Sequence, residues 1–229
     1  MTRTPHGGFF ITFEGGEGAG KSSQVKRLAD HLRHLGARVT LTREPGGSPG
    51  AERLRELLLS GAVRDFGPVA EAMIFSAARI DHLDHTIRPA LARGEVVICD
   101  RFIDSTRAYQ GASGQIEPAF LDMLERIAIG PTRPNLTLIL DLPPHIGMAR
   151  AGLRRGANQI DRFESEAISF HEHLRQTFRE IAKAEPDRCR LIDASLSEAE
   201  VAASIWAKIS PYLPAMGLGA QAQTMEPSA

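Results

Sequence analysis

The sequence has little cysteine and no concentration of positive charge. Its 229 residues include two cysteines, Cys99 and Cys189, which stand far apart and form no CxxC pair. This usage argues against a disulfide framework or a zinc site and is typical of buried thiols in a reducing compartment. Lys and Arg total 27 against 28 Asp and Glu, a formal net charge of −1. We therefore expect neither a nucleic acid nor a membrane surface as a partner, since both are bound through a basic excess.

Long hydrophobic runs are also missing. The N-terminal segment MTRTPHGGFF has no apolar stretch that fits a signal peptide, and no segment approaches the roughly 20 apolar residues of a membrane span. We therefore expect a cytoplasmic protein. Hydrophobic residues still make up 42% of the chain, which supplies a large core and excludes wholesale disorder.

What the sequence does contain is an alternation of short β-branched runs with longer helical stretches. Strands are predicted at Phe9–Glu14, Arg38–Arg43, Glu95–Asp100, Leu136–Leu142 and Arg190–Ala194. Helices are predicted at Lys21–Leu35, at Pro68–Arg93 with an interruption near Pro89, at Phe163–Lys183, and from a capping box of Ser197 and Glu200 to Ile209. Near-continuous apolar strands are typical of parallel sheets covered on both faces. The pattern predicts an α/β fold, a doubly wound five-stranded parallel sheet flanked by helices.

Two segments depart from this alternation. Arg154–Gln159 brings two cations, a glycine and polar residues together, which predicts a short mobile lid over about residues 152–162. From Pro214 onward the chain is small and polar, so residues 214–229 are predicted to be a frayed tail. Residues 1–213 then form one domain that carries the lid as an insertion.

A glycine-rich motif follows the first predicted strand and opens the first predicted helix. Residues 15–22, GGEGAGKS, match GxxxxGK[ST] in the strand-to-helix context that this motif requires. Backbone N–H groups of such a loop converge on phosphate oxygens, and the helix N-terminus adds partial positive charge. Lys21 reaches the outer phosphates, and the Ser22 hydroxyl suits Mg²⁺. The motif predicts a nucleoside-triphosphate site formed by Gly15, Gly16, Glu17, Gly18, Ala19, Gly20, Lys21, Ser22 and Ser23.

This motif alone does not separate a kinase from a GTPase, a motor or a nucleotide-dependent switch. The sequence has no NKxD guanine signature, and motors usually need a longer chain with added domains. Further motifs stand where a second, small phosphorylated substrate would bind. Thr42-Arg43-Glu44-Pro45-Gly46-Gly47 follows the second predicted strand, and the run from Asp100-Arg101-Phe102 to Ala108-Tyr109-Gln110-Gly111 follows the third. Carboxyl ends of parallel strands meet at one edge of the sheet, so these segments can converge on one cleft.

Together with the glycine-rich loop, these motifs resemble the thymidylate kinase family in its bacterial form, from about Phe10 to Ile209. The resemblance implies a P-loop nucleoside-monophosphate kinase fold with a short lid. It implies a transferase that uses ATP and Mg²⁺ to phosphorylate dTMP to dTDP in nucleotide biosynthesis, usually as a homodimer. The expected metal ligands are the Ser22 hydroxyl and Asp100, whose carboxylate ends the third predicted strand and would hold Mg²⁺ through water or orient the phosphate acceptor. The expected catalytic residues are Lys21, Glu17, Asp100, Arg154 and Arg155.

The same resemblance implies a dTMP pocket. Phe75 would stack on thymine, and Arg79, four residues later on the same helix face, would contact the base edge. Arg43 and Arg101 are forked cations suited to the substrate phosphate, and Tyr109 would pack against the sugar. The predicted dTMP-binding residues are Glu17, Arg43, Phe75, Arg79, Arg101, Ser105, Thr106, Tyr109 and Gln110. Each also has a structural interpretation, as an ion pair, a core aromatic or a solvated side chain.

Position 18 bears on where the catalytic arginine lies. Gly18 stands where the eukaryotic form of the family has an arginine, so Lys21 is the only cation in the loop. Arg154 and Arg155 in the predicted lid are then the expected source of positive charge on the transferring phosphoryl group. Two alternatives remain at this point: another nucleoside-monophosphate kinase, and a P-loop module that binds ATP as a switch without an acceptor. The histidines of the chain, including His82 and His85, are expected to bind no metal.

Overall fold

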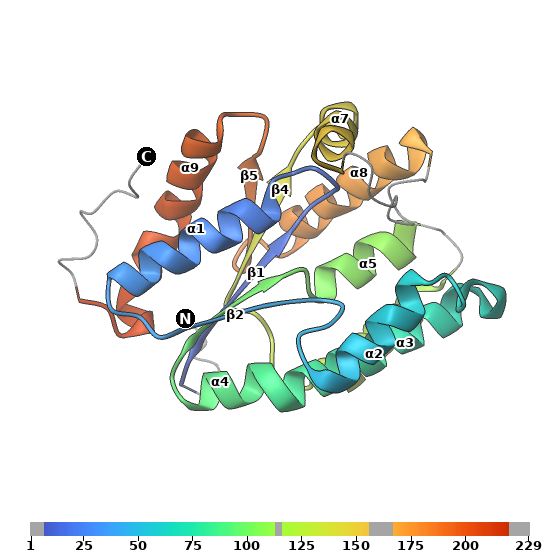
Figure 1. The fold of residues 1–229 in the computed structure, drawn as a ribbon, viewed down its shortest axis with the longest axis horizontal. Helices are drawn as coiled ribbons and strands as arrows, with labels where there is room; N and C mark the ends of the chain where they lie inside the picture. Colours follow the sequence, from blue (N-terminus) through green and yellow to red (C-terminus); the bar gives the residue numbers. More distant parts are fainter. Residues whose placement is uncertain (1–6, 113–115, 156–166, 220–229) are drawn as a thin grey trace.

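The computed structural model describes residues 7–112, 116–155 and 167–219; of Ala112, Arg154 and Arg155 it describes the backbone alone. Five strands form one parallel sheet in the order β2-β3-β1-β4-β5 (Figure 1). The strands are β1 (Phe9–Glu14), β2 (Val39–Arg43), β3 (Val96–Asp100), β4 (Leu136–Asp141) and β5 (Cys189–Asp193). The central strand β1 is buried along its whole length. The predicted five-stranded parallel sheet is confirmed.

Helices cover both faces of this sheet (Figure 1). They are α1 (Lys21–His34), α2 (Pro49–Leu59), α3 (Gly67–His82), α4 (Arg88–Ala92), α5 (Ile103–Ala112), α6 (Pro118–Ile129), α7 (Pro144–Arg155), α8 (Ile168–Ala184) and α9 (Glu198–Ile209). Short helical turns occupy Arg64–Phe66, Leu83–Ile87 and Ser210–Met216. Among the described residues, no helix is both long enough and apolar enough to cross a bilayer.

Two apolar clusters hold the layers together, one on each face of β1. Phe9, Ile11 and Phe13 point toward α1 and α9, with Val25, Leu32 and Trp206 in the same cluster. Phe10 points the other way, into a cluster with Val97, Phe102 and Leu91. The alternation of side chains along a strand therefore explains why β1 is apolar at nearly every position. Thr12 and Glu14 share the face of Phe10, and both are fully buried.

The predicted elements agree with the structure within a few residues, with two corrections. The interruption expected near Pro89 is a π-helical turn at Leu83–Ile87, and Pro89 follows it in the first turn of α4. The tail predicted from Pro214 begins too early, because the chain stays helical to Met216 and Leu218 packs into the cluster on the α1 face. The capping box of Ser197 and Glu200 is present.

The predicted lid begins inside a helix. Gly152, Leu153, Arg154 and Arg155 form the end of α7, and the remainder of the predicted lid, from residue 156 to 162, lies outside the described residues. The predicted helix Phe163–Lys183 corresponds to α8, and its first four residues also lie outside. Four helices had no counterpart in the sequence prediction: α2, α5, α6 and α7.

Candidate functional site

One cavity of about 330 Å³ opens beyond the carboxyl ends of β1, β2 and β3. It is the position at which open α/β sheets bind ligands. All nine predicted dTMP-binding residues line it, together with five residues of the glycine-rich loop, Gly18, Ala19, Gly20, Lys21 and Ser22, and with Asp100. It is also lined by Glu44, Pro45, Arg55, Leu59 and Phe102, to which the sequence analysis gave no role.

The glycine-rich loop joins β1 to α1. Gly15, Gly18 and Gly20 all have positive φ, and a Cβ at Gly18 would overlap the carbonyl oxygen of Gly147 on α7, so a side chain does not fit there. The Lys21 ammonium donates to the carbonyl oxygens of Gly15 (2.9 Å) and Gly16 (2.8 Å). Burial and the neighbouring Arg101 lower the pKa of Lys21 to about 8. Ser23 is exposed on α1, outside the residues that line the cavity.

Oxygen ligands for a divalent cation lie at the end of the loop. The Ser22 hydroxyl donates to Asp100 Oδ2 at 2.8 Å, which places a hydroxyl and a carboxylate side by side. Mg²⁺ prefers such hard oxygen ligands and is usually bound by one or two protein groups plus phosphates and water. The described residues contain no group of three or more His, Cys, Asp or Glu side chains arranged for a metal. The donor set fits a cation that a nucleotide brings with it.

Arg101, Glu17 and Tyr109 form a compact charged cluster beside the loop. Arg101 Nη2 lies 2.6 Å from Glu17 Oε1, and the Tyr109 hydroxyl donates to the same oxygen at 2.7 Å. The guanidinium carbon of Arg101 lies 5.0 Å from the centre of the Tyr109 ring. Burial by itself would raise the pKa of Glu17, but the charges of Arg101 and Lys21 outweigh it and lower that pKa to about 2. Glu17 is therefore an anion held between two cations, which explains how a carboxylate is tolerated inside a phosphate loop.

A second buried pair lines the same cavity. Arg79 on α3 donates from Nε to Glu44 Oε2 at 2.7 Å and from Nη2 to Thr106 Oγ1 at 3.0 Å. His82, one turn further along α3, contacts the other oxygen of Glu44 at 3.1 Å. Phe75 lies one turn before Arg79 and also lines the cavity. The aromatic ring and the guanidinium are thus presented together, as their spacing of four residues predicts.

The remaining predicted residues at this site have partners within the protein. Arg43 pairs with Glu52 at 3.1 Å, and both side chains are largely exposed. Gln110 donates to Glu71 at 3.2 Å, and the Ser105 hydroxyl donates to Glu14 at 2.6 Å.

Comparison with known proteins agrees with this geometry. A family model described as thymidylate kinase matches residues 13–205. The chain belongs to the thymidylate kinase family. It is 55% identical over 206 residues to a thymidylate kinase of Bradyrhizobium sp. strain ORS 278, which covers 90% of this chain and 91% of that relative. A thymidylate kinase of Rhodopseudomonas palustris strain TIE-1 is 57% identical over 200 residues, 87% of each chain.

A solved structure supports the same assignment. The crystal structure of thymidylate kinase from Ehrlichia chaffeensis matches with a TM-score of 0.72 at 32% identity, over 88% of this chain and 98% of that one. The predicted fold of a P-loop nucleoside-monophosphate kinase is therefore confirmed.

Within this family fold, the end of β4 does not reach the cavity. Asp141 is the last residue of β4. Its carboxylate accepts from Arg175 at 2.6 and 2.9 Å and from Arg179 at 2.7 Å. It lines a much smaller adjacent cavity of about 20 Å³, together with Gly15 and Gly16. The two arginines of α8 thus hold Asp141 away from the larger cavity.

The structure also brings in residues that the sequence analysis did not single out. Glu44 lies inside the quoted TREPGG motif, and its pairing with Arg79 spans 35 positions of sequence. Glu14 directly precedes the glycine-rich loop and is fully buried. In both cases the signal available in the sequence was an acidic residue in a motif or directly beside one. The side chains of Arg154 and Arg155 lie outside the described residues, so their predicted role stays a prediction.

Proposed function

We propose that this protein transfers a phosphoryl group from ATP to dTMP, producing ADP and dTDP. The observation that carries the proposal is that one cavity is lined by both the triphosphate loop and the complete set of predicted dTMP-binding residues. Membership in the thymidylate kinase family supports the same reaction. A nucleotide switch without an acceptor would not need the second set.

The donor side of the reaction uses the glycine-rich loop and Lys21. The loop amides and the N-terminus of α1 bind the ATP phosphates, and the Lys21 ammonium moves from its carbonyl partners to the transferring phosphoryl group. Ser22 and Asp100 would hold Mg²⁺, which would neutralise charge on the phosphates. Transfer is direct and in line, so the chain contributes positioning and charge stabilisation without a covalent intermediate.

The acceptor side uses the predicted dTMP-binding residues that line the cavity. Arg101, with Arg43 nearer the rim, binds the dTMP phosphate, and Glu17 limits the position of the Arg101 guanidinium. Phe75 stacks on thymine while Arg79 contacts the base edge, and Tyr109 packs against the sugar. Ser105, Thr106 and Gln110 line the same part of the cavity. Arg154 or Arg155, at the end of α7, supplies charge to the transferring group.

We also propose that two copies of the chain associate through α3 and α6, which pack side by side. Val69, Met73 and Ile80 are exposed and lie on one face of α3, and Met123 and Ile127 are exposed one turn apart on α6. Exposed apolar side chains gathered on neighbouring helices are typical of a protein interface. Light scattering coupled to gel filtration is expected to give twice the chain mass, and M73E is expected to give the monomer. A monomeric wild type contradicts this association.

The activity is tested by incubating the protein with ATP, Mg²⁺ and each nucleoside monophosphate in turn while measuring ADP. We expect rapid turnover with dTMP, weak turnover with dUMP because a methyl group contributes only about 1–3 kcal/mol, and little with dCMP. Equal rates on dCMP and dTMP would assign the protein to another nucleoside-monophosphate kinase activity. ATP binding without turnover of any monophosphate would identify a switch.

Two variants test the donor side and the acceptor side of the cavity independently. R101A is expected to raise the KM for dTMP strongly and to leave ATP binding nearly unchanged, because it removes a contact to one phosphate only. K21A is expected to lower kcat and weaken ATP use. Equal loss of ATP affinity in both variants contradicts the division into donor and acceptor sides.

A further inference from the structure

Glu14 is a fully buried carboxylate that the proposed reaction does not use. It is the last residue of β1, directly before the glycine-rich loop. It does not line the 330 Å³ cavity. A buried carboxylate is costly unless its oxygens are hydrogen-bonded, so its partners are informative.

Those partners all belong to the start of α5. Glu14 Oε1 accepts from the backbone N–H of Phe102 at 2.8 Å and from that of Ser105 at 3.2 Å, while Oε2 accepts from the Ser105 hydroxyl at 2.6 Å. The first N–H groups of a helix have no partner within the helix and are usually capped by a side chain just before it. Here the cap comes from a strand 88 positions earlier in the sequence.

The residue immediately before this cap is Arg101, which has an unusual backbone. Its φ of 69° makes it the one non-glycine residue with positive φ in the described part of the chain. Left-handed backbone is strained for a residue with a Cβ, so neighbouring contacts must hold it. The N–H of Arg101 donates to the carbonyl of Phe13 at 2.8 Å, and the N–H of Phe102 donates to Glu14. Phe13 and Glu14, the last two residues of β1, thus bind the peptide N–H groups before and after the Arg101 Cα.

The turn at Arg101 decides where its guanidinium lies. With the backbone in this conformation, the side chain reaches Glu17 at 2.6 Å and the Gly15 carbonyl at 3.3 Å, and it lies over the Tyr109 ring. An extended or right-handed backbone at Arg101 would redirect its Cα–Cβ bond. The contact that the proposed function assigns to the dTMP phosphate therefore depends on the turn.

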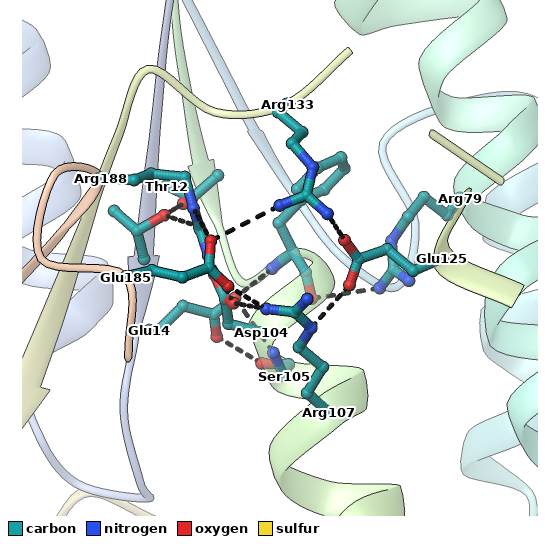
Figure 2. A network of polar contacts seen from close by, with 12 residues as sticks. Thr12, Glu14, Arg79, Asp104, Ser105, Arg107, Glu125, Arg133, Glu185 and Arg188 are labelled. Carbon is teal, nitrogen blue, oxygen red and sulfur yellow. Dashed lines mark hydrogen bonds and ion pairs between the residues drawn. The ribbon is translucent and has the colours of Figure 1, made fainter. Parts of the chain in front are cut away.

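A network of ion pairs fixes the other side of α5 (Figure 2). The Asp104 carboxylate, fully buried beside Glu14, accepts from Arg188 at 2.7 and 2.9 Å. Arg107, one turn along α5, pairs with Glu125 on α6 at 2.7 Å and with Glu185. These contacts hold the body of α5 in place. In the turn before it, Glu14 and Phe13 accept the backbone N–H groups of Phe102 and Arg101, and Arg79 donates to the Phe102 carbonyl at 3.1 Å.

We propose that Glu14 is a positioning residue for dTMP binding: by accepting the N–H groups of Phe102 and Ser105, it holds Arg101 in the left-handed turn that directs its guanidinium to the substrate phosphate. This inference rests on the proposed role of Arg101. It requires an acceptor oxygen at position 14. A negative charge is not required, because the oxygen of a glutamine can accept the same two N–H groups.

Two variants of similar volume separate the acceptor from the bulk of the side chain. E14Q keeps an oxygen for both N–H groups, whereas E14L removes it. We expect E14Q to keep the KM for dTMP within about threefold of wild type. We expect E14L to raise it about tenfold to a hundredfold, the range for a displacement of roughly 1 Å, while the KM for ATP changes less than about twofold. If E14L does not fold, E14D, whose carboxylate is one methylene shorter, is expected to give a smaller rise of the same kind.

Two controls distinguish positioning from a general loss of structure. T12V removes a buried hydrogen bond to Thr137 on the same face of β1 and is expected to lower the melting temperature without changing the KM for dTMP. In an R101A background, E14L is expected to add nothing to the KM for dTMP, because Glu14 acts through Arg101. The proposal is wrong if E14L raises both KM values equally, if E14Q is as impaired as E14L, or if E14L and R101A add.

A structural measurement separates this proposal from the proposed function. A crystal structure of E14L is expected to show Arg101 outside the left-handed region, and this readout needs no activity. If wild type does not turn over dTMP, the proposed function is wrong, while the φ of Arg101 in E14L still decides whether Glu14 holds the turn. An unchanged φ in E14L overturns the proposal.

Discussion

Replacing Glu44 by Gln removes one charge from a buried ion pair while keeping the volume of the side chain. The Glu44 side chain is 6% exposed and that of its partner Arg79 is 4% exposed, and their closest atoms lie 2.7 Å apart. The other Glu44 oxygen contacts His82, which is completely buried. The substitution therefore leaves the Arg79 guanidinium buried with neutral acceptors only, the Phe102 carbonyl and the Thr106 hydroxyl among them.

The size of the effect follows from this burial. Breaking a buried pair by removing one partner costs about 3–5 kcal/mol, because a buried charge is left uncompensated. For a chain of 150–250 residues, 1 kcal/mol shifts the melting temperature by about 2–4 °C, so E44Q is expected to melt roughly 6–20 °C below wild type. R79M is expected to cost a similar amount. The double variant leaves no charge unpaired within the pair, so its cost is expected to fall short of the sum by about 2 kcal/mol or more.

Urea denaturation at pH 7 measures the free energy of unfolding of wild type, E44Q, R79M and the double variant. E52Q is the matched control, because it breaks the pair of Glu52 with Arg43, whose side chains are 41% and 52% exposed, and is expected to cost at most about 1 kcal/mol. Activity gives a second readout: R79M is expected to lose much of the preference for dTMP over dCMP. The buried pair is not the coupled unit that its geometry indicates if E44Q lowers the free energy of unfolding no more than E52Q does. The same conclusion follows if the losses caused by E44Q and R79M are additive in the double variant.

Two further predictions concern Glu14 and the lid. Burial and the neighbouring Asp104 carboxylate raise the pKa of Glu14 from 4.5 to about 7. Between these pH values the folded protein retains a proton that the unfolded chain releases. The free energy of unfolding should therefore fall by about 3 kcal/mol as the pH rises from 4.5 to 7. E14Q should lack this part of the pH dependence in urea denaturation at pH 5 and pH 8; identical pH profiles in the two proteins would contradict the raised pKa. R154A is expected to lower kcat at saturating ATP far more than it raises the KM for dTMP, because its contact strengthens only as charge develops on the transferring group. A near-normal kcat in R154A, in R155A and in the double variant would assign these arginines to ATP attraction alone.

The parts of the fold that the sequence predicts are those whose causes are local. β1 is predicted with its observed bounds because the run Phe9–Glu14 is apolar at nearly every position, as burial on both faces of the sheet requires. The start of α9 is predicted because Ser197 and Glu200 cap it from within four residues. α5 was missed because its N-terminal N–H groups are satisfied by Glu14, far away in the sequence. The end of the domain was placed too early because Leu218 packs into a core cluster that no local pattern of residues 214–218 reveals.

The site divides in the same way. The glycine-rich loop and the spacing of Phe75 and Arg79 are local patterns, and the structure places Phe75, Arg79 and residues 17–22 of the loop along one cavity. The pairing of Arg79 with Glu44 and of Arg101 with Glu17 joins residues 35 and 84 positions apart, so only the folded chain reveals it. Sequence motifs thus predict which side chains carry the chemistry. The partners that fix their charge and direction follow from topology.

The backbone directly after β1 contacts a cation from each side of the cavity. The carbonyl of Gly15, the residue after β1, accepts from both the Lys21 ammonium at 2.9 Å and the Arg101 guanidinium at 3.3 Å. The Lys21 ammonium on the donor side and the Arg101 guanidinium on the acceptor side therefore contact the same backbone oxygen. Glu14 holds the turn that carries Arg101. In-line transfer requires the two phosphates to be aligned within a fraction of an ångström. Because β1 is the central, fully buried strand, its end fixes the starting position of both cations before the Lys21 ammonium moves to the transferring phosphoryl group.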